Sequence, residues 1–256
     1  MSFGDDAEGN LYEQLGVGYT AARRSDPRIV TQIHDALGDA HSIANVGACS
    51  GAYEPCDRTV MTIESSPRMI AQRPPELAPA IRGHAESLPL ISDSVDAAMA
   101  CLTLHHWTDW RIGVQELRRV ARKRVVIFTY DPSYSKYFWL LRDYVPKLGQ
   151  LECGRFPGID EQCAATGEEV RVEPVLIPHD CADGLLASYW RRPSAYLDER
   201  VREGIPTFHL PDGEWLLDGL EGLAEDLRTG TWRDRNHDIL SCTELDLGYR
   251  LLVCEL

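Results

Sequence analysis

The spacing of apolar residues predicts a helix near the start of the chain. Ile29, Ile33 and Leu37 recur four residues apart, as residues on the buried face of an α-helix do. Asp26 stands before this stripe with a proline directly after it, which is typical of a helix N-terminus, and Gly38 follows as a natural stop. We therefore expect a helix between Asp26 and Gly38.

The pattern then changes to short apolar runs separated by segments with helical spacing. The predicted strands are residues 43–46, 59–63, a run that ends near 82–83, residues 95–101 and residues 125–129. Ser66 and the proline after it restart a helix, and Trp110, Val114, Leu117 and Ala121 form a second helical stripe. Strands alternating with helices in this way are typical of a parallel sheet with helices on both faces.

The second half of the chain is less regular and predicts a cap of helices. Residues 170–177 and 244–254 have the pattern of strands, and the segment between them is rich in helix formers and tryptophan. That segment is too long for a bare loop inside a compact domain. We expect one domain over residues 1–256, with N-terminal helices at 8–40, a core at about 40–132, 168–178 and 244–256, and a helical cap at about 134–148 and 180–243.

The net charge of the chain limits the classes of binding partner that are expected. The chain has 256 residues, with 26 Lys and Arg against 40 Asp and Glu, which gives a net charge of −14. A protein this acidic lacks the basic surface that grips phosphate backbones or anionic membranes, so no nucleic-acid or membrane partner is expected. The balance does not restrict a small molecule bound in a pocket, and it leaves open whether the protein is a monomer or a homodimer.

The N-terminus and the cysteines indicate a cytoplasmic protein. The first residues lack the basic and apolar regions of a signal peptide, and no apolar run approaches the roughly eighteen residues of a membrane span. Eight cysteines occur without a Cys-x-x-Cys pair or regular spacing. In a chain of this length, that pattern is typical of reduced thiols.

Candidate chemistry gathers where the first two predicted strands end. Ligands of open parallel sheets bind at the carboxyl ends of the strands. The first strand is followed by a loop from Gly47 to Gly51, and Glu64 follows the second strand, seventeen residues after Gly47. Glycines allow a ligand close to the backbone, and an acidic side chain at this place can accept hydrogen bonds from both hydroxyls of a ribose.

A dinucleotide cofactor fits this loop poorly. The Gly-x-Gly-x-x-Gly fingerprint, counted from Gly47, would require glycines where Cys49 and Ala52 stand. Only residues 48–58 join the first strand to the second, which leaves little room for the helix that cradles a pyrophosphate. The ribose-type signal therefore indicates a different nucleoside cofactor.

Four motifs in order carry a resemblance to a known family. They are residues 47–55, 63–69, 83–89 and 96–107, which read GACSGAYEP, IESSPRM, GHAESLP and DAAMACLTLHHW. Together they resemble the class I S-adenosylmethionine-dependent methyltransferases of the small-molecule kind often labelled type 11, over roughly residues 10–132. The resemblance implies an α/β fold with a Rossmann-like, doubly wound, mostly parallel seven-stranded sheet, S-adenosylmethionine as cofactor, and methyl transfer to an O, N or C nucleophile of a small molecule.

The resemblance also assigns the cofactor-binding positions. The methionine part of the cofactor would lie over the backbone of Gly47, Ala48, Cys49 and Gly51, with Cys101 and Leu102 closing over its end. Glu64 would hold the ribose, Ser65 and Met69 would flank the adenine, and His84 and Ala85 would contact the adenine edge. The cofactor carboxylate would be reached by Tyr19 with Arg23 or Arg24.

Three positions depart from the family pattern. The family usually has an acidic residue where Asn45 stands, a glycine where Cys49 stands and an aspartate where His84 stands. We expect the loss of the first carboxylate to weaken the ordering of the loop and the Cys49 side chain to crowd the backbone approach. These departures leave open a second interpretation, in which the fold is repurposed as a non-methylating enzyme or a binding protein.

Three residues past the fourth and fifth strands are candidates to remove a proton from the acceptor. His106 is the first candidate, His105 the second and Asp131 the third, because histidine and carboxylate side chains can act as bases near neutral pH. In the alternative interpretation the histidines bond backbone and support Trp107, and Asp131 with the following proline forms a turn.

Aromatic residues and an arginine are candidates to bind the acceptor. The proposed substrate-binding residues are Trp107, Trp139, Trp190 and Arg191. An apolar wall with a few polar groups suits a small-molecule pocket. The alternative is that these aromatics form the cap's own core and that Arg191 caps a helix end.

Cys49 and Cys101 also raise the question of a metal. Neighbouring strands one and four would bring both thiols to the mouth of the cofactor site, where His84 or His105 could complete a site for a thiophilic ion. Small polarizable side chains beside a ligand are far commoner, so no metal is expected.

Overall fold

The computed structural model describes residues 24–210 and 213–256, and its centre is a seven-stranded sheet in the order β3-β2-β1-β4-β5-β9-β6. The strands from β3 across to β5 are parallel, whereas β9 runs antiparallel to both β5 and β6. The bounds are β1 Ser42–Val46, β2 Thr59–Glu64, β3 Ala80–Arg82, β4 Val95–Cys101, β5 Ala121–Tyr130, β6 Val170–Pro174 and β9 Tyr249–Glu255. This is the Rossmann-like sheet that the sequence predicts.

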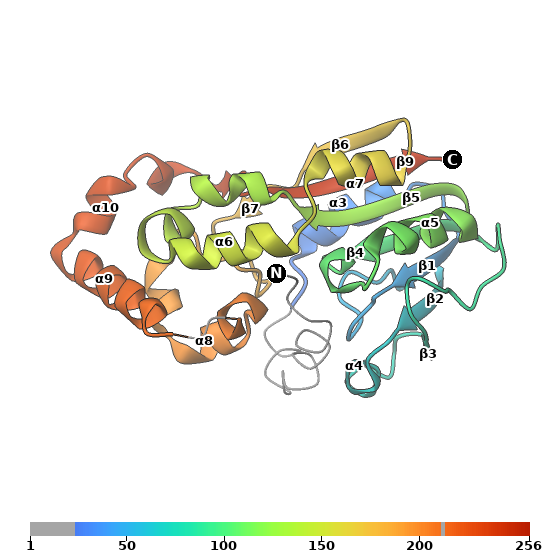
Figure 1. Ribbon diagram of the computed structural model, residues 1–256, viewed down its shortest axis with the longest axis horizontal. Coiled ribbons are helices and arrows are strands. Elements are labelled where there is room, and N and C mark those ends of the chain that lie inside the picture. The colour runs from blue at the N-terminus through green and yellow to red at the C-terminus, as the bar shows by residue number, and fades with distance from the viewer. Residues whose placement is uncertain (1–23, 211–212) are drawn as a thin grey trace.

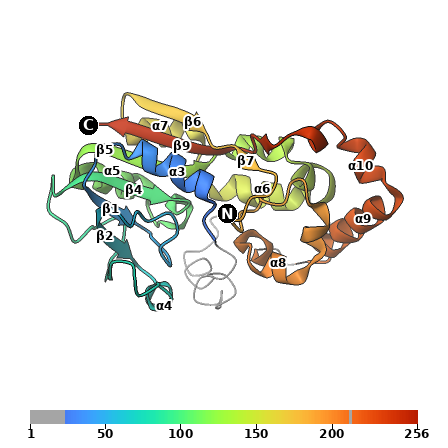
Figure 2. The same cartoon turned by 180° about the vertical axis from the view of Figure 1, so that it is seen from behind.

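Helices cover both faces of the sheet because apolar side chains of the central strands alternate between them (Figure 1). Val126 and Phe128 pack with helix α3 (Pro27–Ala36), whereas Val125 and Ile127 pack on the side of helix α5 (Trp110–Val120). Figure 2, seen from behind, shows α3 in front of the strands. The described helices on the α5 side also include α7 (Ile159–Thr166), which contacts α5.

The helix starts predicted from the sequence are confirmed. The Asp26 side chain accepts a hydrogen bond from the backbone N–H of Arg28 at the start of α3. Ser66 caps helix α4 (Pro67–Ala71) by accepting from the N–H of Met69. Gly38 has a φ of +56°, which ends α3 in the left-handed region that favours glycine.

A cap of short helices extends from the sheet. Its elements are η2 Pro132–Tyr137, η3 Leu140–Tyr144, α6 Pro146–Arg155, η4 Pro193–Leu197, α8 Glu199–Glu203, η5 Pro206–His209, α9 Trp215–Thr229, α10 Thr231–Arg235 and η6 Ile239–Ser241. Most buried apolar side chains of the cap form one continuous cluster with those beneath α3. The cap therefore shares its core with the sheet.

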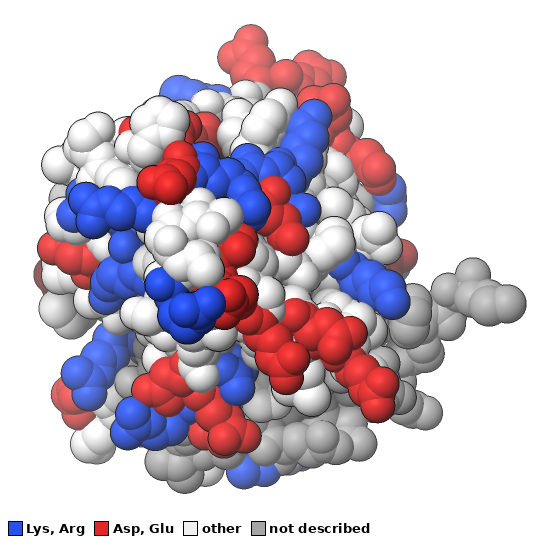
Figure 3. Space-filling view, turned by 90° about the vertical axis from the view of Figure 1, so that its left-hand side faces the viewer, with Lys and Arg blue, Asp and Glu red and all other residues white. Residues whose placement is uncertain are grey.

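Viewed from the cap end, basic and acidic side chains are interspersed over the surface (Figure 3). Ion pairs account for part of this mixture, since Arg228 contacts Glu225 and Arg235 contacts Asp226 at 2.6 and 3.1 Å. No helix of the described residues is both long enough and apolar enough to cross a membrane.

Several boundaries differ from those expected. Strand β5 begins at Ala121, so this residue belongs to the strand and not to the preceding helical stripe. The expected strands at 170–177 and 244–254 are each divided, because Ile177–Pro178 (β7) and Glu244–Leu245 (β8) pair in a separate two-stranded sheet. Helix α6 continues to Arg155 and α7 follows, in a stretch where three glycines interrupt any clear apolar stripe.

Candidate active site

A pocket opens where strands β1, β2 and β4 end. Its lining includes residues 45–50, 52–53, 64–66, 69, 83–86, 101–103 and 106–108. Strands β1 and β4 are hydrogen-bonded neighbours, so the loops that follow them meet at one edge of the sheet. Ten of the thirteen predicted cofactor-binding residues lie in this lining, namely Gly47, Ala48, Cys49, Glu64, Ser65, Met69, His84, Ala85, Cys101 and Leu102.

Gly47 is required at the end of β1 by geometry on two counts. Its φ is +67°, and a Cβ at this position would lie 2.2 Å from Oγ1 of Thr103. Thr103 follows β4, so the two loops touch through the bare backbone of Gly47. A larger residue at position 47 would force these loops apart and change the floor of the pocket.

Glu64 lies buried at the end of β2 and fixes two backbone segments around the pocket. One carboxylate oxygen accepts a hydrogen bond from the N–H of Cys49 at 2.7 Å, and the other accepts from the N–H of Ser66 at 2.8 Å. An ionised carboxylate has about four lone-pair positions, so each oxygen retains the capacity to accept another bond. This arrangement fits a ligand that offers a pair of hydroxyl groups.

Three pocket residues other than glycine have a left-handed backbone. Cys49, Tyr53 and Leu102 have φ values of 51°, 64° and 50°. Residues with side chains adopt this region at a cost of roughly 1–2 kcal/mol each. Strained backbone of this kind is concentrated at functional sites, which supports a functional role for this pocket.

Asn45 occupies the position where the family pattern has an acidic residue, and it is hydrogen-bonded to a carboxylate from elsewhere in the chain. Its Nδ2 donates to Oε2 of Glu54 at 3.0 Å, and the hydroxyl of Thr62 donates to the same oxygen at 3.0 Å. Arg73 forms a buried ion pair with Glu54 at 2.9 Å. A carboxylate is therefore present beneath the loop, but it comes from position 54.

His106 and Trp107 line the pocket through the turn η1 (Leu104–His106) that follows β4. The ring centroid of His105 lies 3.7 Å from that of His106 and 4.0 Å from that of Phe156, so His105 contacts both rings. His105 itself does not line the pocket. The Trp107 ring packs against α5, where a Cβ on Gly113 would lie 2.2 Å from Cε3 of the indole.

Asp131, the third candidate base, caps η2 by accepting from the N–H of Ser133 at 3.0 Å and does not line the pocket.

The three other predicted acceptor-binding residues also lie outside the lining, within the cap. Trp139 donates to the carbonyl of Trp190, and Trp190 donates to that of Ile177. Arg191 donates to the carbonyls of Leu240 and Cys242. Their positions match the cap-core alternative.

The remaining predicted residues are placed as follows. Tyr19 lies outside the described residues, as does Arg23, and Arg24 is exposed. Gly51 turns the loop with a φ of +101° and faces the side chains of Leu77 and Arg73 instead of the pocket.

The polar lining residues that were not predicted include Tyr53, Glu86, Thr103 and Thr108. Thr103 and Thr108 flank the histidine pair just past β4, so the strand-end rule that selected the histidines applied to them as well. Tyr53 and Glu86 stand inside quoted motifs, but the resemblance gives those positions no role.

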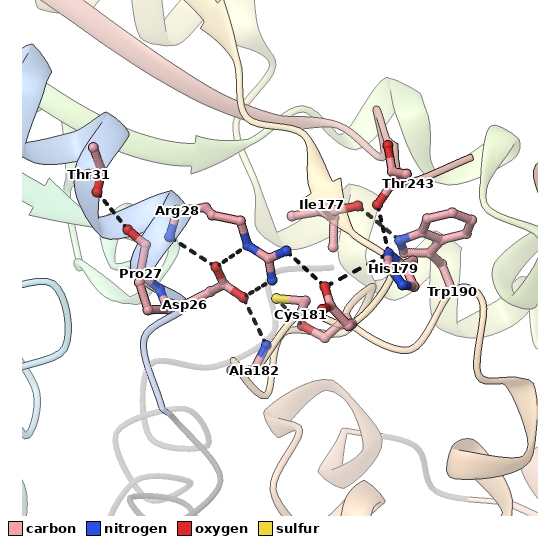
Figure 4. A network of polar contacts seen from close by, with 12 residues as sticks. Asp26, Pro27, Arg28, Thr31, Ile177, His179, Cys181, Ala182, Trp190 and Thr243 are labelled. Carbon is pink, nitrogen blue, oxygen red and sulfur yellow. Dashed lines mark hydrogen bonds and ion pairs between the residues drawn. The ribbon is translucent and has the colours of Figure 1, made fainter. Parts of the chain in front are cut away.

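A polar junction joins the start of α3, the loop after β1 and the start of the cap. Asp26 accepts hydrogen bonds from Arg28 and from the N–H of Ala182, the latter at 3.0 Å (Figure 4). The Tyr53 hydroxyl donates to the buried carboxylate of Asp183. A pocket residue is thus connected directly to the cap segment around residues 180–183.

Within residues 24–210 and 213–256, no group of three His, Cys, Asp or Glu side chains could hold a metal ion. Cys49 and Cys101 both line the pocket, as expected from the adjacency of β1 and β4.

Comparison with known proteins finds a solved structure that is similar to this chain over nearly its whole length and at 33% sequence identity. A protein from Anabaena variabilis, assigned to the methyltransferases of an antibiotic biosynthesis pathway, has 33% sequence identity and a TM-score of 0.84. The alignment covers 92% of this chain and 99% of that one. A profile of the family described as a methyltransferase domain matches residues 44–129. No curated protein sequence matches the chain.

Two more distant structures share the fold. A SAM-dependent methyltransferase from Thermotoga maritima has 19% identity and a TM-score of 0.50, and the alignment covers 66% of this chain and 81% of that one. The [4+2]-cyclase SpnF has 15% identity and a TM-score of 0.50, with 89% and 79% covered. The fold is therefore shared by a methyltransferase and by an enzyme named for cyclisation.

Proposed function

Because this chain belongs to the class I S-adenosylmethionine-dependent methyltransferases, we propose that it transfers a methyl group to an oxygen, nitrogen or carbon nucleophile of a small molecule. The observation that carries the proposal is the composition of one pocket, which brings Glu64 and the loop from Gly47 together with His106. The Anabaena relative's assignment to antibiotic biosynthesis supports a small natural product as acceptor. The net charge of −14 supports a partner other than a polyanion, and the cysteine pattern supports the cytoplasm.

The cofactor site is assigned to residues of this pocket. Glu64 would accept from the ribose hydroxyls, and the backbone around Gly47 would lie under the methionine part. Met69 is buried and would give an apolar surface beside the adenine, with His84 and Ala85 at its edge. S-adenosylmethionine supplies an electrophilic methyl group on a positively charged sulfur when it is bound.

The protein's own task is then to align the acceptor, exclude water and take a proton. His106 is the proposed base because, of the three candidates, it alone lines the pocket. His105 is proposed to support the His106 ring from the side of Phe156. Trp107, Thr108 and Tyr53 replace the tryptophans of the cap as the proposed acceptor contacts, since they line the same cavity.

Isothermal titration tests the proposal directly. We expect wild-type protein to bind S-adenosylmethionine and S-adenosylhomocysteine, and Glu64→Ala to bind both at least about tenfold more weakly, because two charge-assisted hydrogen bonds are lost. Glu76→Ala, an exposed residue outside the lining, is the matched control. Absence of binding at millimolar cofactor would refute the proposal.

Methyl transfer is separated from a repurposed fold by following the cofactor. The protein is incubated with methyl-labelled S-adenosylmethionine and a fractionated small-molecule extract. Label transferred to an acceptor supports the methyltransferase, whereas cofactor that is bound but never consumed supports a non-methylating enzyme, which the fold of the [4+2]-cyclase permits.

A further inference from the structure

The acidic group missing from β1 is replaced by a buried cluster under the cofactor loop. Asn45 on β1 and Thr62 on β2 are direct partners in the parallel register. Their side chains reach the same oxygen of Glu54, each at 3.0 Å. Asn45, Thr62 and Glu54 are buried, so this carboxylate is held between the two strands that form the pocket floor.

Arg73 neutralises the carboxylate from the far side. Its Nη2 donates to both oxygens of Glu54, at 2.9 and 3.1 Å, and to the carbonyl of Ala78 at 2.8 Å. The two side chains are 5% and 1% exposed, so the pair is shielded from water. The charges cancel, and Arg73 also packs under the loop at Gly51, where a Cβ would lie 3.2 Å from Nη1.

This pair fixes the orientation of the Asn45 amide. An ionised carboxylate only accepts hydrogen bonds, so the end of the amide that faces Glu54 must be Nδ2. The carbonyl oxygen, Oδ1, is then the acceptor that this pocket-lining residue keeps for other groups. Position 45 offers a neutral acceptor in a set orientation, in place of a carboxylate.

We propose that Glu54 and Arg73 are positioning residues for the cofactor, which orient the Asn45 amide and brace the loop from Gly47 to Gly51 against β2. The inference rests on the proposed function, because it requires that the pocket binds S-adenosylmethionine. It also makes a counterintuitive prediction: the acidic residue usual in the family should be harmful here.

Asn45→Asp tests the idea because it places a second carboxylate about 3 Å from Glu54 in a buried site, where like charges repel strongly. Glu54→Gln removes that repulsion in the double variant, since a glutamine amide can donate to the new aspartate. Replacing either residue alone therefore harms the site, and replacing both restores it.

The experiment measures the dissociation constant of S-adenosylhomocysteine by calorimetric titration, at a temperature where urea unfolding shows each variant to be fully folded. We expect Asn45→Asp and Glu54→Gln each to weaken binding about tenfold, and the double variant to return to within about threefold of wild type. Asp96→Asn is the control. It loses an ion pair to Arg122 at the opposite end of the sheet, so it should lower stability without changing the dissociation constant.

Provided that wild-type protein binds S-adenosylhomocysteine, two results would overturn the proposal. One is an Asn45→Asp variant that binds as tightly as wild type, and the other is a double variant that binds no better than a single one. If Asn45→Asp does not fold, the dissociation constants of Glu54→Gln and the double variant decide the question. The double variant binds more tightly than Glu54→Gln only if positions 45 and 54 are energetically coupled. Failure of wild type to bind would refute the proposed function itself.

Discussion

Several single residues around the pocket have a left-handed backbone conformation, which is unfavourable for residues with a side chain. The sequence predicted that the side chain of Cys49 would crowd the loop, since the family has glycine there. The structure adds a second reason for glycine, because Cys49 has a φ of 51°. Backbone angles are set by the surrounding loops and cannot be inferred from residue type, so the strain at Tyr53 and Leu102 was not foreseen.

Cys49→Gly should raise the free energy of unfolding by up to about 1.5 kcal/mol. Relief of left-handed strain contributes about 1–2 kcal/mol, and the greater freedom of glycine in the unfolded chain offsets about 0.5–1 kcal/mol of it. Urea denaturation measures the change. Cys49→Ala keeps a Cβ and the strain, so it should show no gain; equal gains in both variants would disprove the explanation.

His106→Ala should lower the rate constant for methyl transfer by about 10²- to 10⁴-fold, because a positioned base contributes that much. The dissociation constant of S-adenosylmethionine should change little. Single-turnover kinetics with an identified acceptor measure the first quantity and calorimetric titration the second. Asp131→Asn is the comparison: it lies outside the lining, and a loss as large as that of His106→Ala would show that the base is misassigned.

At the level of elements, the sequence predicted what depends on local pattern and missed what depends on packing. Strand β4 and the starts of α3 and α4 were predicted correctly, because their apolar runs and capping residues are local signals. Helix α7 lacks such a stripe and is held by its contact with α5. The acceptor residues assigned to the cap lie outside the pocket lining for a related reason: the density of tryptophan predicts burial, but not against which partner.

Two glycines of helix α9 should respond oppositely to alanine. A Cβ on Gly219 would lie 2.3 Å from the backbone oxygen of Tyr144, whereas a Cβ on Gly222 would meet only a ring carbon of Tyr144 at 3.9 Å. Gly219→Ala should therefore destabilise by about 1–3 kcal/mol through overpacking. Gly222→Ala should stabilise by about 0.5–1 kcal/mol through helix propensity. Thermal unfolding compares them, and the same sign in both would contradict this packing of α9 on η3.

For the molecule as a whole, the cap and the sheet are connected through buried groups far apart in sequence. The alternation of helices and strands was sufficient to predict the sheet, and the length of the segment between the last two predicted strands indicated additional helices there. Neither could predict the junction in which Asp26 binds the N–H of Ala182, because that contact joins residues 156 positions apart. The junction connects α3 to the cap beside the pocket.

Asp26→Asn should weaken this connection and change the response to acid. The Arg28 guanidinium, helped by backbone N–H groups, lowers the pKa of Asp26 to about 2. An unfolded aspartate titrates near 3.9, so the stabilisation is present above about pH 4 and is lost as the pH falls towards 2. The variant should lose about 1–3 kcal/mol at neutral pH and lack this part of the acid transition.

Urea unfolding from pH 7 to pH 2 measures both effects. Asp198→Asn is a matched control, because Asp198 caps α8 and pairs with Arg200 in the same local arrangement but at the surface. It should have little effect. Equal losses in the two variants would show that the connection to the cap contributes nothing beyond helix capping.

The Trp107 ring, which packs on Gly113 and also lines the pocket, gives the protein a built-in optical probe. Indole emission shifts with the polarity of its surroundings, so ligand entry beside Trp107 should change the spectrum without any added label. Trp107→Phe should abolish that change, whereas Trp110→Phe, which lies outside the lining, should preserve it. Ligand binding to this protein could therefore be screened by intrinsic tryptophan fluorescence.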